Sequence, residues 1–225
     1  LKMIVSDGVF SMDGDVAPIH ELVSLAEGHE AMLMIDECHA TGLCGKTGRG
    51  TLEDVGLLGH PNVIINSTMG KAMGGMSGGY TSGPAQLVEV LRNRSRPYLF
   101  SNSLPPCLVA GAQAAYEIVM GDNSRLEALQ RNTAHFRQGM QVAGFKILGN
   151  STHPIMPIFL EDAHLAKNMA NLLLEKGIFV MGFSYPVVPK GLARIRVQMS
   201  AAHSPEQVQH AVDAFTMAGK ELGAI

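Results

Sequence analysis

The sequence lacks the features that mark a membrane-spanning or disulfide-rich protein. No apolar run reaches the roughly 18 residues that a membrane-spanning helix needs. Only three of the 225 residues are cysteines, and an odd number in a chain this long predicts reduced thiols rather than a disulfide framework. We therefore expect no membrane partner and a reducing compartment, which is the cytoplasm, or the mitochondrial matrix if the source is eukaryotic.

Strong charge is absent as well. The 17 basic and 20 acidic side chains give a formal net charge of −3, and no block of like charge appears along the chain. This balance gives no reason to expect nucleic acid or an anionic membrane surface as a partner. Low-complexity tracts and internal repeats are also missing, and a hydrophobic content of 46% is enough to bury a full core.

The first half contains short apolar segments that alternate with amphipathic ones. This order is typical of an α/β domain, in which helices cover a largely parallel sheet. Strands are predicted at 2–6, 31–35, 63–67 and 79–81, and helices at 19–27, 85–93, 108–120 and 126–143. Since strand-like sequence begins almost at Leu1, we expect the chain to begin inside a domain.

The second half has a different pattern, with strands predicted at 146–148, 155–159, 178–181 and 194–199 around a helix at 163–176. A final helix is predicted to start at the capping box Ser204-Pro205-Glu206-Gln207, whose side chains can satisfy free backbone amides. We therefore expect part of a large, mostly parallel α/β domain at 1–121, a linking helix at 122–144 and a small α+β domain at 145–225.

Two segments carry the candidate chemistry. Lys71 lies on a turn of small residues, Ser67 to Gly75, after a predicted strand, where its amine could form a Schiff base. Asp36 ends another predicted strand, at the edge where open α/β sheets bind ligands, and His39 follows three residues later. An ionised aspartate there could hold a protonated pyridine ring, so the pattern indicates pyridoxal phosphate (PLP). A surface lysine, a helix-capping aspartate and a structural histidine are the alternatives that the residues alone leave open.

Two further segments could contact ligands. Arg194 and Arg196 project from the same face of one predicted strand, and one of them could bind a substrate carboxylate through two parallel hydrogen bonds. The polar turn Ser101-Asn102-Ser103 precedes a helix and could donate hydrogen bonds to a phosphate. A solvated strand face and an ordinary turn explain the same residues without any ligand.

Other motifs indicate different chemistry, and they fit poorly. Residues 36–39 match a helicase-type acidic box, and residues 40–47 resemble the phosphate-binding loop of nucleoside triphosphatases. That loop should lie far upstream of the box, and Ala40 replaces its first glycine. A zinc site is a poorer alternative because the paired spacing of structural zinc ligands is missing. Its ligands would be Cys38, His39, Cys44 and Cys107.

Longer strings resemble a known family. The strings are residues 36–42, 48–50, 68–75 and 101–106. They resemble the α-oxoamine synthases, which are PLP enzymes of fold type I that join an amino acid to an acyl-CoA. Within that family, residues 7–14, 96–103 and 183–191 resemble the branch that uses glycine and acetyl-CoA, and the resemblance covers the whole chain.

The resemblance implies a role for each residue of the cofactor site. Lys71 would be the Schiff-base lysine, and Asp36 would be the partner of the pyridine nitrogen. His39 would form a hydrogen bond with the phenolic oxygen of the ring, and Ser11 would help to fix the ring. Thr68 would bind the phosphate.

The resemblance also implies a substrate site and an assembly. Arg196, rather than Arg194, would bind the substrate carboxylate. Ser101 and Asn102 match residues that reach the cofactor of the neighbouring subunit, which implies a homodimer with shared sites. Family members carry a longer N-terminal portion, so we expect the chain to be a C-terminal fragment that is inactive alone.

The implied activity is the condensation of glycine with acetyl-CoA to 2-amino-3-ketobutyrate and CoA, or the reverse thiolysis during threonine degradation. Three alternatives stay open at this point. One is a related synthase with another acyl-CoA or amino acid, such as 8-amino-7-oxononanoate or 5-aminolevulinate synthase. The others are a nucleoside triphosphatase and an inactive fragment that serves as a binding or dimerisation module.

Overall fold

The computed structural model describes residues 1–74, 77–149 and 152–225. The chain divides into two compact units. The first contains Leu1–Phe10 and Val16–Asn123, and the second contains Ser11–Asp15 and Ser124–Ile225. The five residues Ser11–Asp15 therefore belong to the second unit, whose other residues all come from the C-terminal part of the chain. Within the described ranges, no helix is both long enough and apolar enough to cross a membrane.

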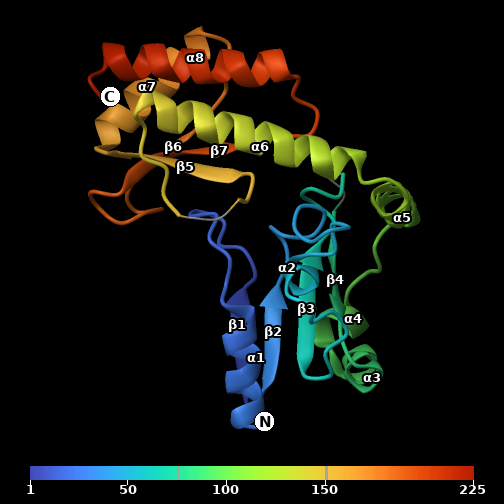
Figure 1. Ribbon diagram of the computed structural model, residues 1–225. Coiled ribbons are helices and arrows are strands. Elements are labelled where there is room, and N and C mark those ends of the chain that lie inside the picture. Colours follow the sequence, from blue (N-terminus) through green and yellow to red (C-terminus); the bar gives the residue numbers. More distant parts are fainter. Residues whose placement is uncertain (75–76, 150–151) are drawn as a thin grey trace. The chain divides into compact units, whose positions relative to one another are not determined.

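The first unit is built around a four-stranded sheet in the order β1-β2-β3-β4 (Figure 1). The first three strands are parallel and β4 is antiparallel to β3. The elements of this unit are β1 (Met3–Asp7), α1 (Ile19–Gly28), β2 (Met32–Asp36), α2 (Thr51–Asp54), β3 (Val63–Thr68), β4 (Gly79–Ser82), α3 (Ala85–Arg94), α4 (Arg96–Phe100) and α5 (Pro106–Gly121). The predicted α/β class is confirmed, and each predicted strand of this unit lies within one residue of the observed one.

The core of the first unit forms where α1 covers one face of the sheet. Leu33 and Ile35 alternate along β2 and are fully buried, while Ile19 and Val23 recur at helical spacing on α1 and pack against them. The register of the sheet pairs Asp36 with both of its neighbours, Asp7 on β1 and Asn66 on β3. Polar side chains therefore lie across the carboxyl end of three parallel strands, which is the edge that binds ligands in such sheets.

The second unit contains a three-stranded antiparallel sheet in the order β5-β7-β6. Its elements are α6 (Ser124–Ala143), β5 (Ile155–Glu161), α7 (Ala163–Glu175), β6 (Gly182–Phe183), β7 (Ala193–Gln198) and α8 (Pro205–Glu221). Helices α6 and α8 pack together through the rings of Phe136 and Phe215, whose centroids are 5.8 Å apart in an edge-to-face arrangement. The assignment of residues 122–144 as a linking helix stays a prediction.

The capping box of α8 is confirmed. The Ser204 hydroxyl accepts from the Gln207 backbone amide at 3.3 Å, and the Gln207 side chain accepts from the Ser204 amide at 2.9 Å. The pattern predicted this helix start because both hydrogen bonds are local.

Two strand predictions in the second unit are wrong. Residues 178–181 are irregular, and only Gly182–Phe183 pairs with β7. Phe179 and Met181 are 78% and 56% exposed, so the apolar pattern of this segment is not matched by burial. Residues 146–148 form a single bridge, between Ile147 and Ile158, instead of a strand. Two short helices, α2 and α4, were not predicted.

Candidate functional site

Asp36 is held as a charged group at the carboxyl end of β2. Its Oδ1 accepts from the Cys38 amide at 2.8 Å, and its Oδ2 accepts from the Asn66 side chain at 3.4 Å. Partial burial by itself raises the pKa of Asp36, but these hydrogen bonds and the positive charge of Lys71 outweigh burial and lower it. The carboxylate can therefore remain ionised while it accepts a hydrogen bond from a cationic N–H group.

The turn that follows Asp36 is fixed through the backbone of Glu37. The Glu37 amide donates to the Asn66 carbonyl at 2.7 Å, and the Glu37 carbonyl accepts from the Ala40 and Thr41 amides, both at 2.9 Å. His39 lies inside this turn and is half-buried. Asp36 and His39 therefore belong to one strand end and turn whose backbone is anchored by these hydrogen bonds.

The side chain of Glu37 was not predicted to matter, yet it fixes the same region. It is 1% exposed, its Oε2 accepts from the Thr51 amide at 2.8 Å, and its Oε1 accepts from the Thr51 hydroxyl. A Cβ atom at Gly8 or Gly50 would collide with this carboxylate. Gly50 belongs to residues 48–50, one of the strings that carry the family resemblance. The sequence therefore singled out this glycine, but it did not show that the Glu37 carboxylate lies against it.

Lys71 lies on the turn after β3, and its side chain is exposed. Thr68 shapes the start of this turn, because its hydroxyl donates to the Gly78 carbonyl at 3.1 Å and accepts from the Gly70 amide at 3.0 Å. Lys71 lies close enough to Asp36 for its charge to lower the pKa of that carboxyl. Gly75, which the sequence placed on the same turn, lies outside the described residues.

A buried contact joins the two site segments. The hydroxyls of Thr41 and Ser67 are 2.8 Å apart, and both side chains are buried. Thr41 ends the turn that contains His39, and Ser67 precedes Thr68 on β3. The structure therefore brings Asp36, His39, Thr68 and Lys71 together at one edge of the sheet.

The polar turn that contains Ser101 and Asn102 follows α4 and is exposed. Leu104, at the end of this turn, packs on Gly78: a Cβ at Gly78 would come within 2.7 Å of the Leu104 methyl groups. The turn is thus anchored beside the Lys71 segment, while the side chains of Ser101 and Asn102 are available to solvent or to another chain.

A cavity of about 660 Å³ opens beside these segments, and its lining includes Cys38, Asn66, Thr68 and Tyr98. Burial, followed by the hydrogen bond with Asp36, raises the pKa of the Cys38 thiol to about 11, so this thiol stays protonated at neutral pH.

In the parts of the chain that the structure describes, no group of three or more His, Cys, Asp or Glu side chains is arranged to hold a metal.

The two candidate arginines lie in the second unit and differ in environment. Arg194 is 3% exposed and forms an ion pair with Asp13 at 2.5 Å, with further hydrogen bonds to the carbonyls of Leu192 and Met12 at 3.1 and 3.2 Å. These contacts commit its guanidinium to the protein. The two side chains do project from the same face of β7, as predicted, but Arg194 is a structural group.

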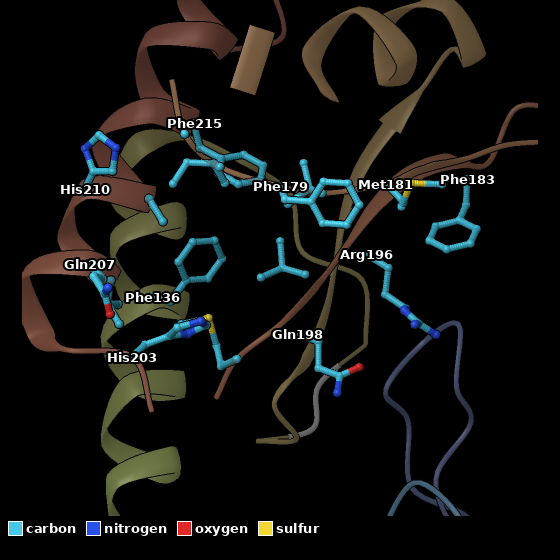
Figure 2. Close-up of a pocket in the computed structure, with 17 residues that line it drawn as sticks. Phe136, Phe179, Met181, Phe183, Arg196, Gln198, His203, Gln207, His210 and Phe215 are labelled. Carbon is cyan, nitrogen blue, oxygen red and sulfur yellow. The ribbon is translucent and has the colours of Figure 1, made fainter. Parts of the chain in front are cut away.

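Arg196 is half-buried and less constrained. Its Nη1 donates to the Ser11 carbonyl at 3.0 Å, and its guanidinium carbon lies 5.4 Å from the centre of the Phe183 ring. Arg196 lies at one end of a cavity (Figure 2), which is also lined by residues of 177–183, of β7 and of α8 and by Phe136 of α6. The volume of this cavity is about 570 Å³. The second unit therefore brings Ser11 and Arg196 together, and of the two arginines Arg196 is the one that can still accommodate a carboxylate.

Comparison with known proteins is consistent with this site. The family profile described as aminotransferase class I and II matches residues 1–215, and the chain belongs to that family.

Over all 225 residues the chain is 54% identical to human mitochondrial 2-amino-3-ketobutyrate coenzyme A ligase, and over 223 residues it is 49% identical to the ligase of Escherichia coli K12. The chain spans about half the length of these curated relatives, 53% and 56% respectively. A serine palmitoyltransferase from S. paucimobilis, solved with a bound PLP–myriocin aldimine, superposes on the whole chain with a TM-score of 0.93 at 34% identity, and the match covers 56% of that protein.

Proposed function

We propose that the protein containing this chain is a PLP-dependent acyltransferase. It would condense glycine with acetyl-CoA to 2-amino-3-ketobutyrate and CoA, or catalyse the reverse thiolysis in threonine degradation. The observation that carries the proposal is the ionised carboxylate of Asp36 at the carboxyl end of a parallel sheet, with the charge of Lys71 close to it. The chain is 54% identical to the human protein named 2-amino-3-ketobutyrate coenzyme A ligase, and this supports the choice of substrates.

The residues of the first unit fit PLP. Asp36 offers a charged acceptor for a protonated ring nitrogen, and Lys71 offers an exposed primary amine on a neighbouring turn. Thr68, the last residue of β3, is the proposed phosphate ligand, and its hydroxyl would donate to the phosphate in place of the Gly78 carbonyl. When bound, the cofactor would withdraw the electron pair that a broken Cα–H bond leaves on the substrate.

Each residue then has a defined task in the proposed mechanism. The Lys71 amine would hold the cofactor, and the same nitrogen is the proposed acceptor of the proton that leaves the glycine Cα. Asp36 would keep the ring nitrogen protonated, because its lowered pKa leaves the carboxylate ionised. His39 would form a hydrogen bond with the phenolic oxygen, and Ser11 would help to fix the ring.

Arg196 is the proposed ligand of the glycine carboxylate. A guanidinium can meet a carboxylate with two parallel hydrogen bonds, and the Phe183 ring restricts how the Arg196 guanidinium can turn. The new carbon–carbon bond forms at the acetyl carbonyl of acetyl-CoA, and the CoA thiolate leaves and takes up a proton.

We also propose a homodimer in which Ser101 and Asn102 reach the cofactor site of the partner subunit. The surface around these residues supports an interface, because α3 has no buried residue and α5 buries only Ala112 within the described chain. Large apolar side chains are exposed along α4 and α5, a pattern that marks interaction surfaces. They include Tyr98, Phe100, Val109, Ile118 and Met120.

For the compartment we propose the cytoplasm, or the mitochondrial matrix in a eukaryote. The human relative is named as mitochondrial, which supports the second choice.

The proposal is tested by expressing the intact reading frame and following the release of the CoA thiol from acetyl-CoA, with and without glycine. We expect release that depends on glycine and is lost in Lys71→Ala. Lys46→Ala is the matched control, because Lys46 is another exposed lysine on a glycine-containing loop. Activity lost in the Lys46 variant but retained in the Lys71 variant would contradict the proposal.

A related synthase is the second candidate, since an 8-amino-7-oxononanoate synthase from Symbiobacterium thermophilum is 42% identical over 224 residues. A panel of acyl-CoA thioesters with glycine, alanine and serine separates the two. A protein that binds PLP but is silent with acetyl-CoA and active with a longer thioester would favour this second candidate.

A further inference from the structure

We infer that Arg194 is a positioning residue for Arg196. Through its ion pair with Asp13, Arg194 holds the segment Ser11–Asp15, and the Ser11 carbonyl of that segment orients the guanidinium that binds the substrate carboxylate. The inference rests on the proposed role of Arg196 and adds a residue that itself touches no substrate.

The segment Ser11–Asp15 has no helix or strand of its own to hold it. Its C-terminal end, Gly14 and Asp15, packs closely against the rest of the second unit. Gly14 has a φ of +73°, and a Cβ there would lie 2.5 Å from the Ile155 carbonyl oxygen. Gly149 has the same φ, and a Cβ on it would lie 2.5 Å from Asp15 Oδ1. The near end, Ser11 to Asp13, is held by the arginines of β7.

Arg194 makes the strongest of these contacts. Its Nη1 reaches both the Met12 carbonyl at 3.2 Å and the Asp13 carboxylate at 2.5 Å, and its side chain is almost completely shielded from water. A charged hydrogen bond is stronger than a neutral one, and shielding from solvent strengthens it further. The position of the segment therefore depends more on Arg194 than on any neutral contact of Ser11 or Met12.

Arg196 lies two residues further along the same strand, and its side chain points toward the same segment (Figure 2). The contacts form a closed path that runs from Arg194 through Asp13 to Ser11 and back to β7 at Arg196. β7 is the central strand of its sheet, so its backbone is fixed on both sides. Changing Arg194 would free the segment and remove the acceptor that orients Arg196, while the charge of Arg196 would remain.

Losing Arg194 has a second consequence, because it leaves the Asp13 carboxylate without its cation. Asp13 is two residues from Ser11, whose carbonyl already contacts Arg196, and its side chain is 45% exposed. The freed carboxylate would compete with the glycine carboxylate for Arg196. This competition predicts that Arg194→Gln weakens glycine binding, and that adding Asp13→Asn restores part of it.

The test uses the full-length holoenzyme with Arg194→Gln, Asp13→Asn, the double variant and Arg194→Lys. Arg131→Gln is the matched control, since Arg131 is an exposed arginine on α6. We expect Arg194→Gln to raise the KM for glycine by about tenfold or more, which is the scale of a lost charged hydrogen bond. The KM for acetyl-CoA should stay within about twofold of wild type, since only the binding of glycine uses Arg196. The double variant should recover at least part of the loss, and Arg194→Lys should lie between wild type and Arg194→Gln.

A second readout needs no cofactor. In the cofactor-free protein, amide hydrogen exchange of residues 12–15 should be faster in Arg194→Gln than in wild type or Arg131→Gln. An equal rise in both KM values, or an unchanged exchange rate in this segment, would overturn the inference. If wild type releases no CoA with glycine, the proposed function fails instead, and the exchange experiment still decides whether Arg194 holds the segment.

Discussion

The carboxylate of Glu37 is buried against Thr51, whose amide and hydroxyl each donate to one of its oxygens. Gly8 and Gly50 leave the space that this carboxylate fills. The contact joins the residue next to Asp36 to the start of α2, fourteen positions along the chain. It ties the geometry of the proposed cofactor site to a side chain that is itself inaccessible to a ligand.

Thr51→Val should destabilise the protein. The substitution keeps the shape of the side chain but leaves one oxygen of a buried carboxylate without its donor, which costs about 1–3 kcal/mol of unfolding free energy. Urea denaturation of the full-length protein measures the change. Thr216→Val is the control, because the Thr216 hydroxyl bonds only within its own helix among the described residues. Equal effects in the two variants would contradict a special role for the Glu37 contact.

The stability difference between wild type and Glu37→Gln should depend on pH. Burial raises the pKa of folded Glu37 above its ordinary value of 4.5, so the folded protein binds this proton more tightly than the unfolded chain. The stability of wild type relative to the variant should therefore fall as the pH rises above 4.5, and level off above the folded pKa. The pKa values of Asp36 and Glu53 are lowered, so their contributions to stability change with pH in the opposite direction. Both residues are present in wild type and in the variant, so these contributions cancel in the difference. Denaturation curves with a constant difference between pH 4.5 and 7 would refute this.

Asp36→Asn should slow proton removal from glycine. The amide cannot stabilise a protonated ring nitrogen as an anion does, and the loss of one preorganised electrostatic contact in an active site costs on the order of 10²–10³ in rate. Exchange of the glycine Cα proton with D₂O, followed without any acyl-CoA, isolates this step. Asn66→Ala removes a neighbouring hydrogen bond to Asp36 while keeping the charge, so its effect should be much smaller. Normal exchange in Asp36→Asn would remove Asp36 from the proposed role.

Mixing two inactive variants should restore activity if the site is shared between subunits. In a heterodimer of Lys71→Ala with Asn102→Ala, one site carries both changes and the other carries neither. Random reassortment of a two-fold dimer then gives about a quarter of wild-type activity. The measurement is glycine-dependent CoA release after the two proteins are unfolded and refolded together. Sites confined to single subunits would stay inactive in the mixture.

Ser204→Ala should cost about 1 kcal/mol, the usual contribution of an N-cap side chain. The Ser204 hydroxyl accepts from the Gln207 amide, and this acceptor is lost in the variant. Ser95→Ala is a suitable control, because Ser95 precedes α4 without a side-chain capping hydrogen bond in the described structure. The midpoint of thermal unfolding measures both, and a larger loss for Ser95→Ala would contradict the assignment of the cap.

The elements that could be predicted from sequence are those whose cause is local. The alternation of Leu33 and Ile35 marks one strand face, and the capping box at Ser204 marks a helix start, because each depends on residues a few positions apart. The strand predicted at 178–181 failed since a strand needs a partner, and the described chain supplies one only from Gly182 onward.

The site divides in the same way. Asp36 and Lys71 could be found because each follows a strand, and strand ends meet at one edge of a parallel sheet. Glu37 was missed because a segment without helix or strand separates it from its partner Thr51, and the sequence pattern does not predict the course of such a segment. The different environments of Arg194 and Arg196 depend largely on contacts with Ser11 and Asp13, more than 180 positions away, which no local pattern encodes.

The path of the chain limits how the protein can be dissected. The polypeptide passes from one unit to the other after Phe10, after Asp15 and again after Asn123. A cut at Asn123 would therefore leave Ser11–Asp15 attached to the first unit and separated from every partner it has in the second. The two units are not interchangeable modules, and a recombinant piece ending there would carry an orphaned segment next to β1, while the other piece would expose a buried arginine.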